Sequence, residues 1–188
     1  MVPTLVTGPT EEPVSLADLK AHLRVEHDDE DEEIFGMGIT ARMYIEERCW
    51  ISLCTQTWRQ VLDGWPSGPI QLSKGPILGI TSVTYRDSDG ATQTLSSSVY
   101  ALLTGGRFAL AYNQQWPTAA LWGQEPFAIT YTAGYGIAEA VPAPLKHALK
   151  LLVGHYYENR EAVVVTQGIT ALAVPMAVDS LLYLYEVR

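Results

Sequence analysis

The segment from Glu12 to Glu33 constrains the fold most, because it contains two helix start signals separated by a tight acidic break. Ser15 can cap the first helix, and Asp18 three residues later resembles the acidic partner of a capping box. Val14 before the cap and Leu19 four residues after it can form a hydrophobic staple. The segment therefore predicts a short helix, a break, and the start of a longer helix.

Asp28 gives the second start signal, with Asp31 three residues later. Carboxylates at a helix N-terminus are favoured by the helix dipole, so the acidic run has a structural role before any chemistry is proposed. An EF-hand loop needs a glycine at its sixth position, and Ile34 stands there when the count starts at Asp29. We therefore expect a solvated helix start and no calcium site.

The second helix should run from about Asp29 to about Trp50 and is apolar on two sides. Its second apolar stripe consists of Phe35, Ile39 and Met43. A helix that is apolar on two sides must be covered on two sides, either deep in a core or by another subunit. Gly36 and Gly38 each cost ~1 kcal/mol against alanine, which a close approach by another backbone would offset. We expect the stripe to be a subunit interface.

From Thr55 the pattern changes to β-branched and aromatic segments separated by turn signals. The strongest strand candidates are residues 57–62, 80–85 and 127–131, and weaker ones are 92–95, 100–103 and 108–111. The pair Asp89-Gly90 suits a hairpin turn. These segments predict a small antiparallel β unit inserted between helices.

Helix returns at Pro142, which the first turn of a helix accepts, and continues to about Asn159. An uncharged run of high β-propensity follows and includes Val163, Val164 and Val165. Exposed on a monomer it would be an aggregation liability, so we expect a partner surface there as well. A short terminal helix then presents one apolar face, formed by Val178, Leu181, Leu182 and Tyr185.

Together these elements predict an α+β fold, in which a bundle of about four helices is interrupted by the small antiparallel β unit. Residues 1–54 would hold an N-terminal arm and the first core helices, 55–135 the inserted β unit, and 136–188 the helices that complete the core. Residues 1 to 12 contain Pro3, Gly8 and Pro9 and suggest a flexible arm, or one that orders on a neighbouring subunit.

The net charge of -9 argues against a protein that grips DNA with its whole surface, because phosphate neutralisation needs lysine and arginine. The start of the chain lacks the basic and apolar regions of a signal peptide, and no apolar run approaches the ~20 residues that span a bilayer. We expect a soluble protein of the cytoplasm, with no membrane contact and with Cys49 and Cys54 as free thiols.

No pattern of catalytic, metal-binding or cofactor-binding residues rises above background. Residues 36–41 match G-x-G-x-x-A, but these glycines fall inside a helix that begins upstream, whereas a dinucleotide site needs a preceding strand. His155 and Glu158 form half of a possible metal site and have no second pair. We therefore expect no enzyme activity, no metal and no cofactor.

Several segments resemble the head–tail connector family of tailed phages, the adaptor or head-completion proteins between portal and tail. The resemblance lies in PVSLADLKAHLRVEHDDED and a long helix after it, and in Val141–Lys146, His155–Glu161 and Pro175–Leu182. It covers most of the chain, although the minimal members of the family are all-helical and lack the β insertion.

The resemblance implies a structural virion protein that forms a ring, commonly of twelve subunits, beneath the portal protein. The ring would surround a DNA channel without sequence-specific binding and offer its lower face to a stopper or tail-completion protein. The family places its C-terminal segment on the portal, which here corresponds to the face with Val178, Leu181, Leu182 and Tyr185. An acidic channel wall would repel DNA phosphates, so we expect the lining to include Asp28, Asp29, Glu30 and Asp31. Such a protein would lie in the virion neck and, during assembly, in the host cytoplasm.

Two alternatives remain open on the sequence alone. One is another neck protein, a stopper or a tail-completion factor, with similar bulk properties. The other is a small carbohydrate- or peptide-binding module that uses the tryptophan-rich β unit, whose aromatic rings are more often core and turn residues. The chain's tryptophans are Trp50, Trp58, Trp65, Trp116 and Trp122.

Overall fold

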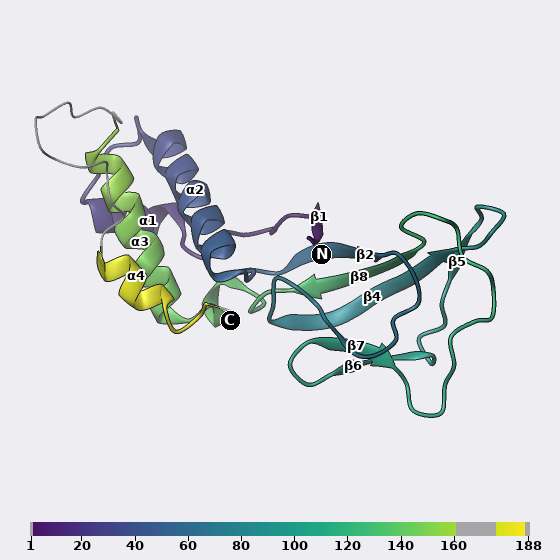
Figure 1. Ribbon diagram of the computed structural model, residues 1–188. Coiled ribbons are helices and arrows are strands. Elements are labelled where there is room, and N and C mark those ends of the chain that lie inside the picture. Colours follow the sequence, from purple (N-terminus) through teal and green to yellow (C-terminus); the bar gives the residue numbers. More distant parts are fainter. Residues whose placement is uncertain (1, 161–175, 187–188) are drawn as a thin grey trace, which may run out of the picture. The chain divides into compact units, whose positions relative to one another are not determined.

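The computed structural model describes residues 2–160 and 176–186, which fold into two compact units (Figure 1). The β unit consists of the residues up to Thr10 together with Cys54–Gly136, and the helical unit of Glu11–Leu53 together with the described residues from Ile137 on. The predicted fold class, α+β with a helical bundle and an antiparallel β unit, is confirmed. The division of the chain into 1–54, 55–135 and 136–188 stays a prediction.

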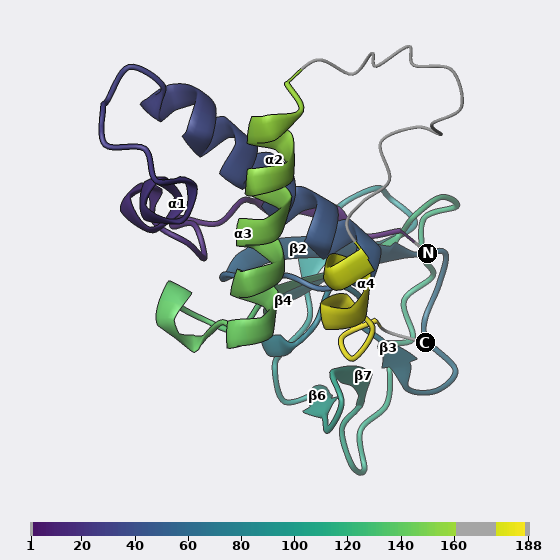
Figure 2. The same ribbon diagram turned by 90° about the vertical axis from the view of Figure 1, so that its left-hand side faces the viewer.

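The described part of the helical unit contains four α-helices and one short 3-10 helix. They are α1 (Leu16–Leu23), α2 (Asp31–Cys49), the 3-10 helix η1 (Ala138–Ala140), α3 (Ala143–Glu158) and α4 (Met176–Leu182). Helix α2 packs against α1 and α3, and α4 packs against α3 (Figure 2). Fully buried aliphatic side chains from all four helices meet in its core, among them Leu19, Ile34, Ile45, Leu149 and Val178.

The start of α1 is as the sequence predicts. The backbone N–H of Asp18 donates to Ser15 Oγ at 3.1 Å, and Ser15 Oγ donates to the Asp18 carboxylate at 2.7 Å. Val14 and Leu19 are both buried, as a hydrophobic staple requires.

The predicted start of the second helix at Asp28 is wrong. Helix α2 begins at Asp31, and Glu30 in the capping position makes no side-chain capping bond. Asp28 instead pairs with Lys20 of α1, at 2.5 Å. An ion pair to the preceding helix therefore replaces the local cap that the sequence pattern suggested.

The two glycines of α2 have different surroundings. A Cβ atom at Gly38 would lie 2.8 Å from Leu19 Cδ1, so this glycine lets α1 pack closely on α2. A Cβ atom at Gly36 would meet nothing within 4 Å. Only Gly38 is thus explained by packing within the chain, and its close neighbour is a side chain of the same chain.

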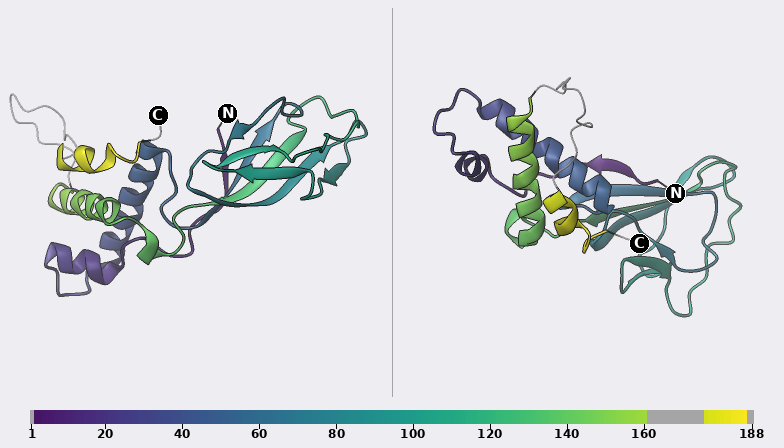
Figure 3. Two further views of the ribbon diagram at one scale, coloured as in Figure 1. Left: turned by 90° about the horizontal axis from the view of Figure 1, so that it is seen from below. Right: turned by 60° about the vertical axis from the view of Figure 1, so that its left-hand side comes forward.

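The β unit contains two antiparallel sheets (Figure 3). One has five strands in the order β1-β2-β8-β4-β5, and the other has three in the order β3-β7-β6. The strands are β1 (Thr4–Thr7), β2 (Gln56–Leu62), β3 (Ile70–Gln71), β4 (Ile77–Arg86), β5 (Thr92–Thr94), β6 (Tyr100–Leu103), β7 (Arg107–Leu110) and β8 (Phe127–Ala133).

Strand β8 shows how one face of the five-stranded sheet forms the core. Phe127, Ile129 and Tyr131 alternate along the strand and belong to the same buried cluster as Phe108 of the smaller sheet. The intervening Thr130 lies on the opposite face, since successive side chains of a strand alternate. The larger sheet therefore buries one face and leaves the other available.

Three of the five tryptophans, Trp58, Trp65 and Trp116, pack against this core. The rings of Trp65 and Trp116 stack at 5.5 Å between centroids, and Trp116 lies 6.0 Å from Phe108. Trp116 Nε1 donates to the carbonyl of Pro66 at 2.9 Å. Core packing is thus the role of Trp65 and Trp116.

The N-terminal arm is not the flexible segment that the sequence suggested. Residues Thr4–Thr7 form strand β1, which pairs with β2, for example Leu5 opposite Trp58. All four side chains of β1 are exposed, so the strand is held by backbone hydrogen bonds. It lacks the alternating burial by which strands are recognised in a sequence.

The Asp89-Gly90 pair does form the turn of a hairpin, between β4 and β5. The N–H of Gly90 donates to the carbonyl of Asp87 at 2.9 Å, and Gly90 has a φ of 82°. That left-handed backbone conformation favours glycine.

The two ends of the β insertion lie beside each other. The N–H of Thr55 donates to the carbonyl of Gly136 at 3.0 Å. A Cβ atom at Gly134 would lie 2.3 Å from the Cys54 carbonyl oxygen, so glycine is required for this contact. The chain therefore enters and leaves the insertion at almost the same place.

Candidate interaction surfaces

The predicted subunit stripe lies on the exposed side of α2. Phe35 is 42% exposed and Met43 58% exposed, and Ile39 between them is half-buried. Gly36 adds exposed backbone beside Phe35, since no described residue outside the helix backbone lies within 4 Å of the position of its missing Cβ. The described part of the helical unit thus leaves this apolar strip partly exposed. Val163, Val164 and Val165, predicted for the same interface, lie outside the described residues.

A buried ionic network holds α2 in place next to this strip. Arg42 contacts Glu46 at 2.8 Å and Glu12 at 2.8 Å, and Glu46 accepts a hydrogen bond from the N–H of Leu53 at 2.9 Å. The side chains of Arg42 and Glu46 are only 10% and 9% exposed. The network ties α2 to the segments before and after it and so gives the strip a fixed support.

The predicted channel-lining carboxylates divide into two pairs. The side chains of Asp28 and Asp29 are 87% and 94% exposed, whereas those of Glu30 and Asp31 are 24% and 33% exposed. Lys20 contacts Asp31 at 2.7 Å as well as Asp28, and its hydrogen bond lowers the pKa of Asp28 below the ordinary value. Only Asp28 and Asp29 thus face solvent fully, and lining of a channel stays a prediction.

Glu30 holds the end of α3 to the start of α2. It accepts a hydrogen bond from the Tyr157 hydroxyl at 2.6 Å and pairs with Arg160 at 2.6 Å. Both contacts lower the pKa of Glu30, the hydrogen bond from Tyr157 most. Arg160 also lies over the Tyr157 ring at 4.4 Å and reaches Glu33 at 3.3 Å. The Glu30 carboxylate is therefore occupied by structural contacts inside the helical unit.

The predicted portal residues differ in burial, and one of them, Tyr185, lies beyond the end of α4 at Leu182. Val178 and Leu182 are fully buried in the helical unit, while Leu181 and Tyr185 are half-buried. The first two therefore attach α4 to the bundle, and the contact of this segment with a portal protein stays a prediction. Side chains that a partner could reach on this segment are Met176, Tyr183 and Leu184, which are 85%, 58% and 81% exposed.

Ion pairs hold α4 against the end of α2. Arg48 contacts Asp179 at 3.6 Å and Glu186 at 3.0 Å.

The buried thiol of Cys49 lies 3.9 Å from the carbonyl oxygen of Leu182. Burial, and secondarily Glu186, raises the pKa of Cys49 to about 11. Cys49 and Cys54 are both free thiols.

The two units differ in charge. The basic residues of the β unit are Arg59, Lys74, Arg86 and Arg107, and its acidic residues are Asp63, Asp87, Asp89 and Glu125. Because these balance, the helical unit carries the whole net charge of -9.

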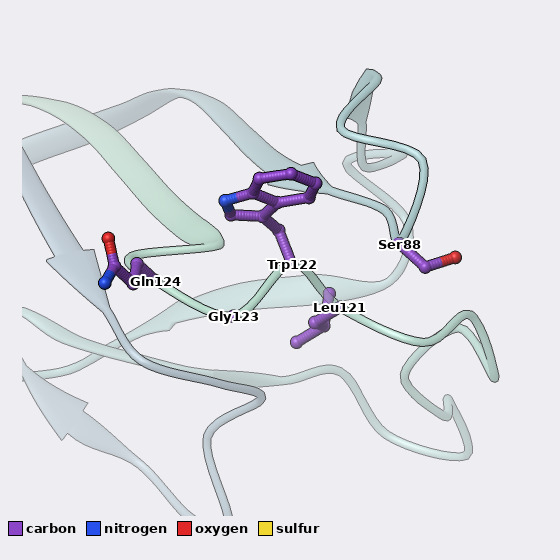
Figure 4. Close-up of a pocket in the computed structure, with 5 residues that line it drawn as sticks. All are labelled: Ser88, Leu121, Trp122, Gly123 and Gln124. Carbon is purple, nitrogen blue, oxygen red and sulfur yellow. The ribbon is translucent and has the colours of Figure 1, made fainter.

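A pocket opens in the β unit beside Trp122 (Figure 4). It has a volume of about 550 Å³ and is lined by Ser88, Leu121, Trp122, Gly123 and Gln124. Trp122 is 40% exposed, and the Arg86 guanidinium lies 5.0 Å from its ring centroid. Sequence reasoning treated the tryptophans as one group and did not distinguish Trp122 from the others. A usable signal was the polar, glycine-containing segment Trp122–Glu125 directly before a buried strand.

The described residues contain no cluster of three or more histidine, cysteine, aspartate or glutamate side chains that could hold a metal ion. None of the described helices is long and apolar enough to cross a membrane.

No family model and no curated protein matches the chain. Solved structures do match it. A chain in the neck of an empty gene transfer agent (GTA) particle computed with C6 symmetry is 25% identical, with a TM-score of 0.79, over 100% of this chain and 97% of the other. A chain in the virion of the native GTA particle matches with the same values. A chain in the neck of the native particle computed with C12 symmetry matches with a TM-score of 0.72. These similarities support a structural protein of the neck of a phage-like particle.

Proposed function

We propose that this chain is a head–tail connector adaptor, a structural protein that forms a ring in the neck of a phage-like particle. Its partners are further copies of itself, a portal protein, and a stopper or tail-completion protein. DNA passes through the ring without sequence-specific binding, and the chain needs no catalytic group or cofactor. The observation that carries the proposal is the similarity over the whole chain to neck chains of a particle with C6 and C12 symmetry.

A closed ring needs two different surfaces on each subunit, because one patch meets a different patch of the neighbour. The strip of Phe35, Ile39 and Met43 suits one of them, since two of its side chains are exposed hydrophobic groups on a rigidly supported helix. Gly36 leaves room for the neighbour's backbone to approach α2. We assign this strip to the subunit interface.

The acidic helical unit suits the wall of a DNA channel. Like charges repel the phosphates, so a duplex slides past such a wall instead of adhering to it. Asp28 and Asp29 are the residues of the acidic break best placed for this role, because both side chains are almost fully exposed. The neutral β unit is better suited to contacts with other proteins of the neck.

The segment from α4 onward supplies the portal contact in this proposal. Tyr183 and Leu184 are exposed apolar residues at the end of α4, and the buried Val178 and Leu182 fix the helix that carries them. A partner that covers Tyr183 and Leu184 would remove apolar surface from water without unfolding the bundle.

The test is the native mass of the full chain, measured by mass spectrometry with and without a purified portal ring. A closed oligomer, alone or only on the portal, is the expected result. Met43→Glu should prevent ring formation, because it places a charge in the apolar interface. Tyr112→Glu is the matched control, since Tyr112 is 92% exposed in the β unit and outside the proposed interfaces. A chain that stays monomeric with the portal present would refute the adaptor role.

A further inference from the structure

We propose that the β unit carries a binding site for a sugar ring, centred on Trp122. The site lies on the face of the five-stranded sheet that the core does not use. The proposal stands independently of the ring, because it rests only on the geometry of the β unit.

The sheet places two arginines on its open face. Arg59 of β2 lies directly opposite Thr130 of β8, and residues opposite each other in a sheet share a face. Thr130 lies between the core residues Ile129 and Tyr131, so its own face is the open one. Arg86 follows Tyr85, whose register partner is the core residue Phe127, and therefore points to the same open face.

The loop before β8 brings the indole of Trp122 next to these arginines. The N–H of Trp122 donates to the carbonyl of Arg86 at 3.0 Å, and Leu121 pairs with Asp87 in an isolated β-bridge. A Cβ atom at Gly90 would lie 3.5 Å from the Trp122 ring, so the hairpin turn packs against the indole. In Figure 4 the side chains of Leu121 and Trp122 leave the loop in opposite directions. The indole is thus supported by the protein and still 40% exposed.

Polar side chains line the space beside the indole, and among them the Arg86 guanidinium lies 5.0 Å from the ring centroid. The pocket in Figure 4 adjoins a second one of about 500 Å³, and Trp122, Gly123 and Gln124 line both. The second pocket also contains Arg59, Asp63, Arg86 and Glu125. Within the described chain, the side chains of Arg59, Asp63, Gln124 and Glu125 form no ion pair or hydrogen bond. This differs from the acidic break of the helical unit, where Asp28, Glu30 and Asp31 contact cations of the chain.

The chemistry of these groups fits a neutral sugar. A pyranose ring presents an apolar C–H face, which packs on an indole, and hydroxyl groups that both donate and accept hydrogen bonds. The site offers donors on Arg59 and Gln124, and acceptors on Asp63, Glu125 and Gln124. A phosphate or other polyanion would meet the two carboxylates, and a lipid chain would leave the charged groups unsatisfied. A few polar groups around an apolar platform are the usual composition of a small-molecule site.

The test uses the indole N–H signals of the full chain in a nitrogen-15 NMR titration with maltohexaose, cellohexaose and chitohexaose. Trp122→Phe identifies the Trp122 signal. At least one oligosaccharide should shift that signal in a saturable manner, while the signals of the core residues Trp65 and Trp116 stay in place. Trp122→Ala should weaken binding by about 10-fold or more, since tryptophan anchors carry a large share of binding energy.

Tyr112→Ala is the matched control, because Tyr112 is an exposed aromatic residue of the same unit outside both pockets. It should bind the sugar as the unchanged chain does. Asp63→Asn gives a second test in case Trp122→Ala fails to fold, and should weaken binding while the other indole signals stay unchanged. Absence of any shift with all three sugars, or binding that survives Trp122→Ala, overturns the proposal.

Discussion

At the scale of single residues, Gly36 and Gly38 show how one residue type has two roles in one helix. Gly38 is needed because Leu19 of α1 occupies the space of a side chain, and Leu19 is only 1% exposed and cannot move away freely. Gly36 has open space around it.

These surroundings predict opposite effects of alanine. Gly36→Ala should raise the free energy of unfolding of the monomer by ~1 kcal/mol, because alanine is the better helix former. Gly38→Ala should lower it by roughly 1–2 kcal/mol, since overpacking outweighs the same helix gain. Urea denaturation followed by circular dichroism measures both. Equal effects of the two substitutions would show that Leu19 does not restrict α2. In ring assays Gly36→Ala should weaken assembly if a neighbour's backbone approaches there.

The buried network of Arg42, Glu46 and Glu12 gives a second prediction at this scale. Arg42→Met should lower the free energy of unfolding by roughly 3 kcal/mol, because it leaves two carboxylates near the protein interior without their cation. The double variant Arg42→Met with Glu46→Leu should recover part of this loss. A double variant that is less stable than Arg42→Met, by denaturant titration, would contradict this reading of the network.

The sequence allowed some residue roles to be predicted and concealed others. The Ser15 cap was predictable because its partner is three residues away. The pairing of Arg42 with Glu12 joins residues 30 positions apart, and no local pattern reveals it. Trp65 and Trp122 are the same residue type. Only the fold places Trp65 in the core and leaves Trp122 on an open face.

At the scale of elements, α1 and α2 are joined by charges whose strength depends on pH. The pKa of Asp28 lies below its ordinary value of 3.8, and that of Lys20 lies above 10.5, chiefly because the two side chains are hydrogen-bonded. A carboxyl group whose pKa is lowered on folding stabilises the fold at pH values above its pKa in the unfolded chain. This stabilisation is lost as the pH falls through the pKa in the folded chain. A lysine whose pKa is raised on folding stabilises the fold at pH values below its pKa in the unfolded chain. This stabilisation is lost as the pH rises through the pKa in the folded chain.

Lys20→Gln should therefore lower the melting temperature at pH 7, where both groups are charged. The difference from the unchanged chain should shrink as the pH falls below the ordinary pKa of aspartate. Thermal melts followed at the helix band of the circular dichroism spectrum, at several pH values, measure this. Arg24→Gln serves as the control, since Arg24 directly follows α1 and forms no ion pair with the described residues. A difference that is constant with pH would show that the pair does not act through charge.

Helix α4 covers Cys49, which makes the packing of this element measurable by thiol chemistry. The raised pKa and the burial should keep Cys49 unreactive toward iodoacetamide at pH 8, because the thiolate is the reactive form. Val178→Asp, which places a charge in the contact between α4 and the bundle, should make Cys49 reactive. Cys54 is the internal control, since it is buried in the β unit. Peptide mass spectrometry of the alkylated chain distinguishes the two thiols, and labelling of Cys49 in the unchanged chain would contradict the stated packing.

Whole elements were predictable where burial leaves a periodic pattern. Strand β8 and helix α3 have such patterns, and both were expected from the sequence. Strand β1 has no buried side chain and β3 only two residues, so the partner strands define both of them. The order of strands in the sheets depends on long-range pairing and could not be deduced from turns.

At the scale of the whole molecule, the β insertion should be separable from the helical unit. A chain that begins at Glu11 and replaces Cys54–Gly136 by a short Gly-Ser linker should keep the helical fold, because Thr55 and Gly136 are hydrogen-bonded neighbours. A short linker adds little loop-closure entropy. A cooperative thermal transition with a helical circular dichroism spectrum is the expected result. A molten or unfolded product would show that the helical unit depends on the insertion.

Chain order and spatial units do not coincide in this molecule, which explains the limit of prediction at this scale. Residues near the N-terminus belong to the β unit through β1, although their neighbours in sequence belong to the helical unit. Composition changes along a chain indicate consecutive segments. They cannot show that a segment returns to a unit formed by distant residues.

The adjacent ends of the insertion also have a consequence for how such genes change. A unit that enters and leaves at one point can be gained, lost or exchanged in a single recombination event without breaking the helical bundle. We therefore expect proteins with the same helical part and either no insertion or an unrelated one. The same junction is a natural place to graft a foreign domain, which would then be displayed once per subunit.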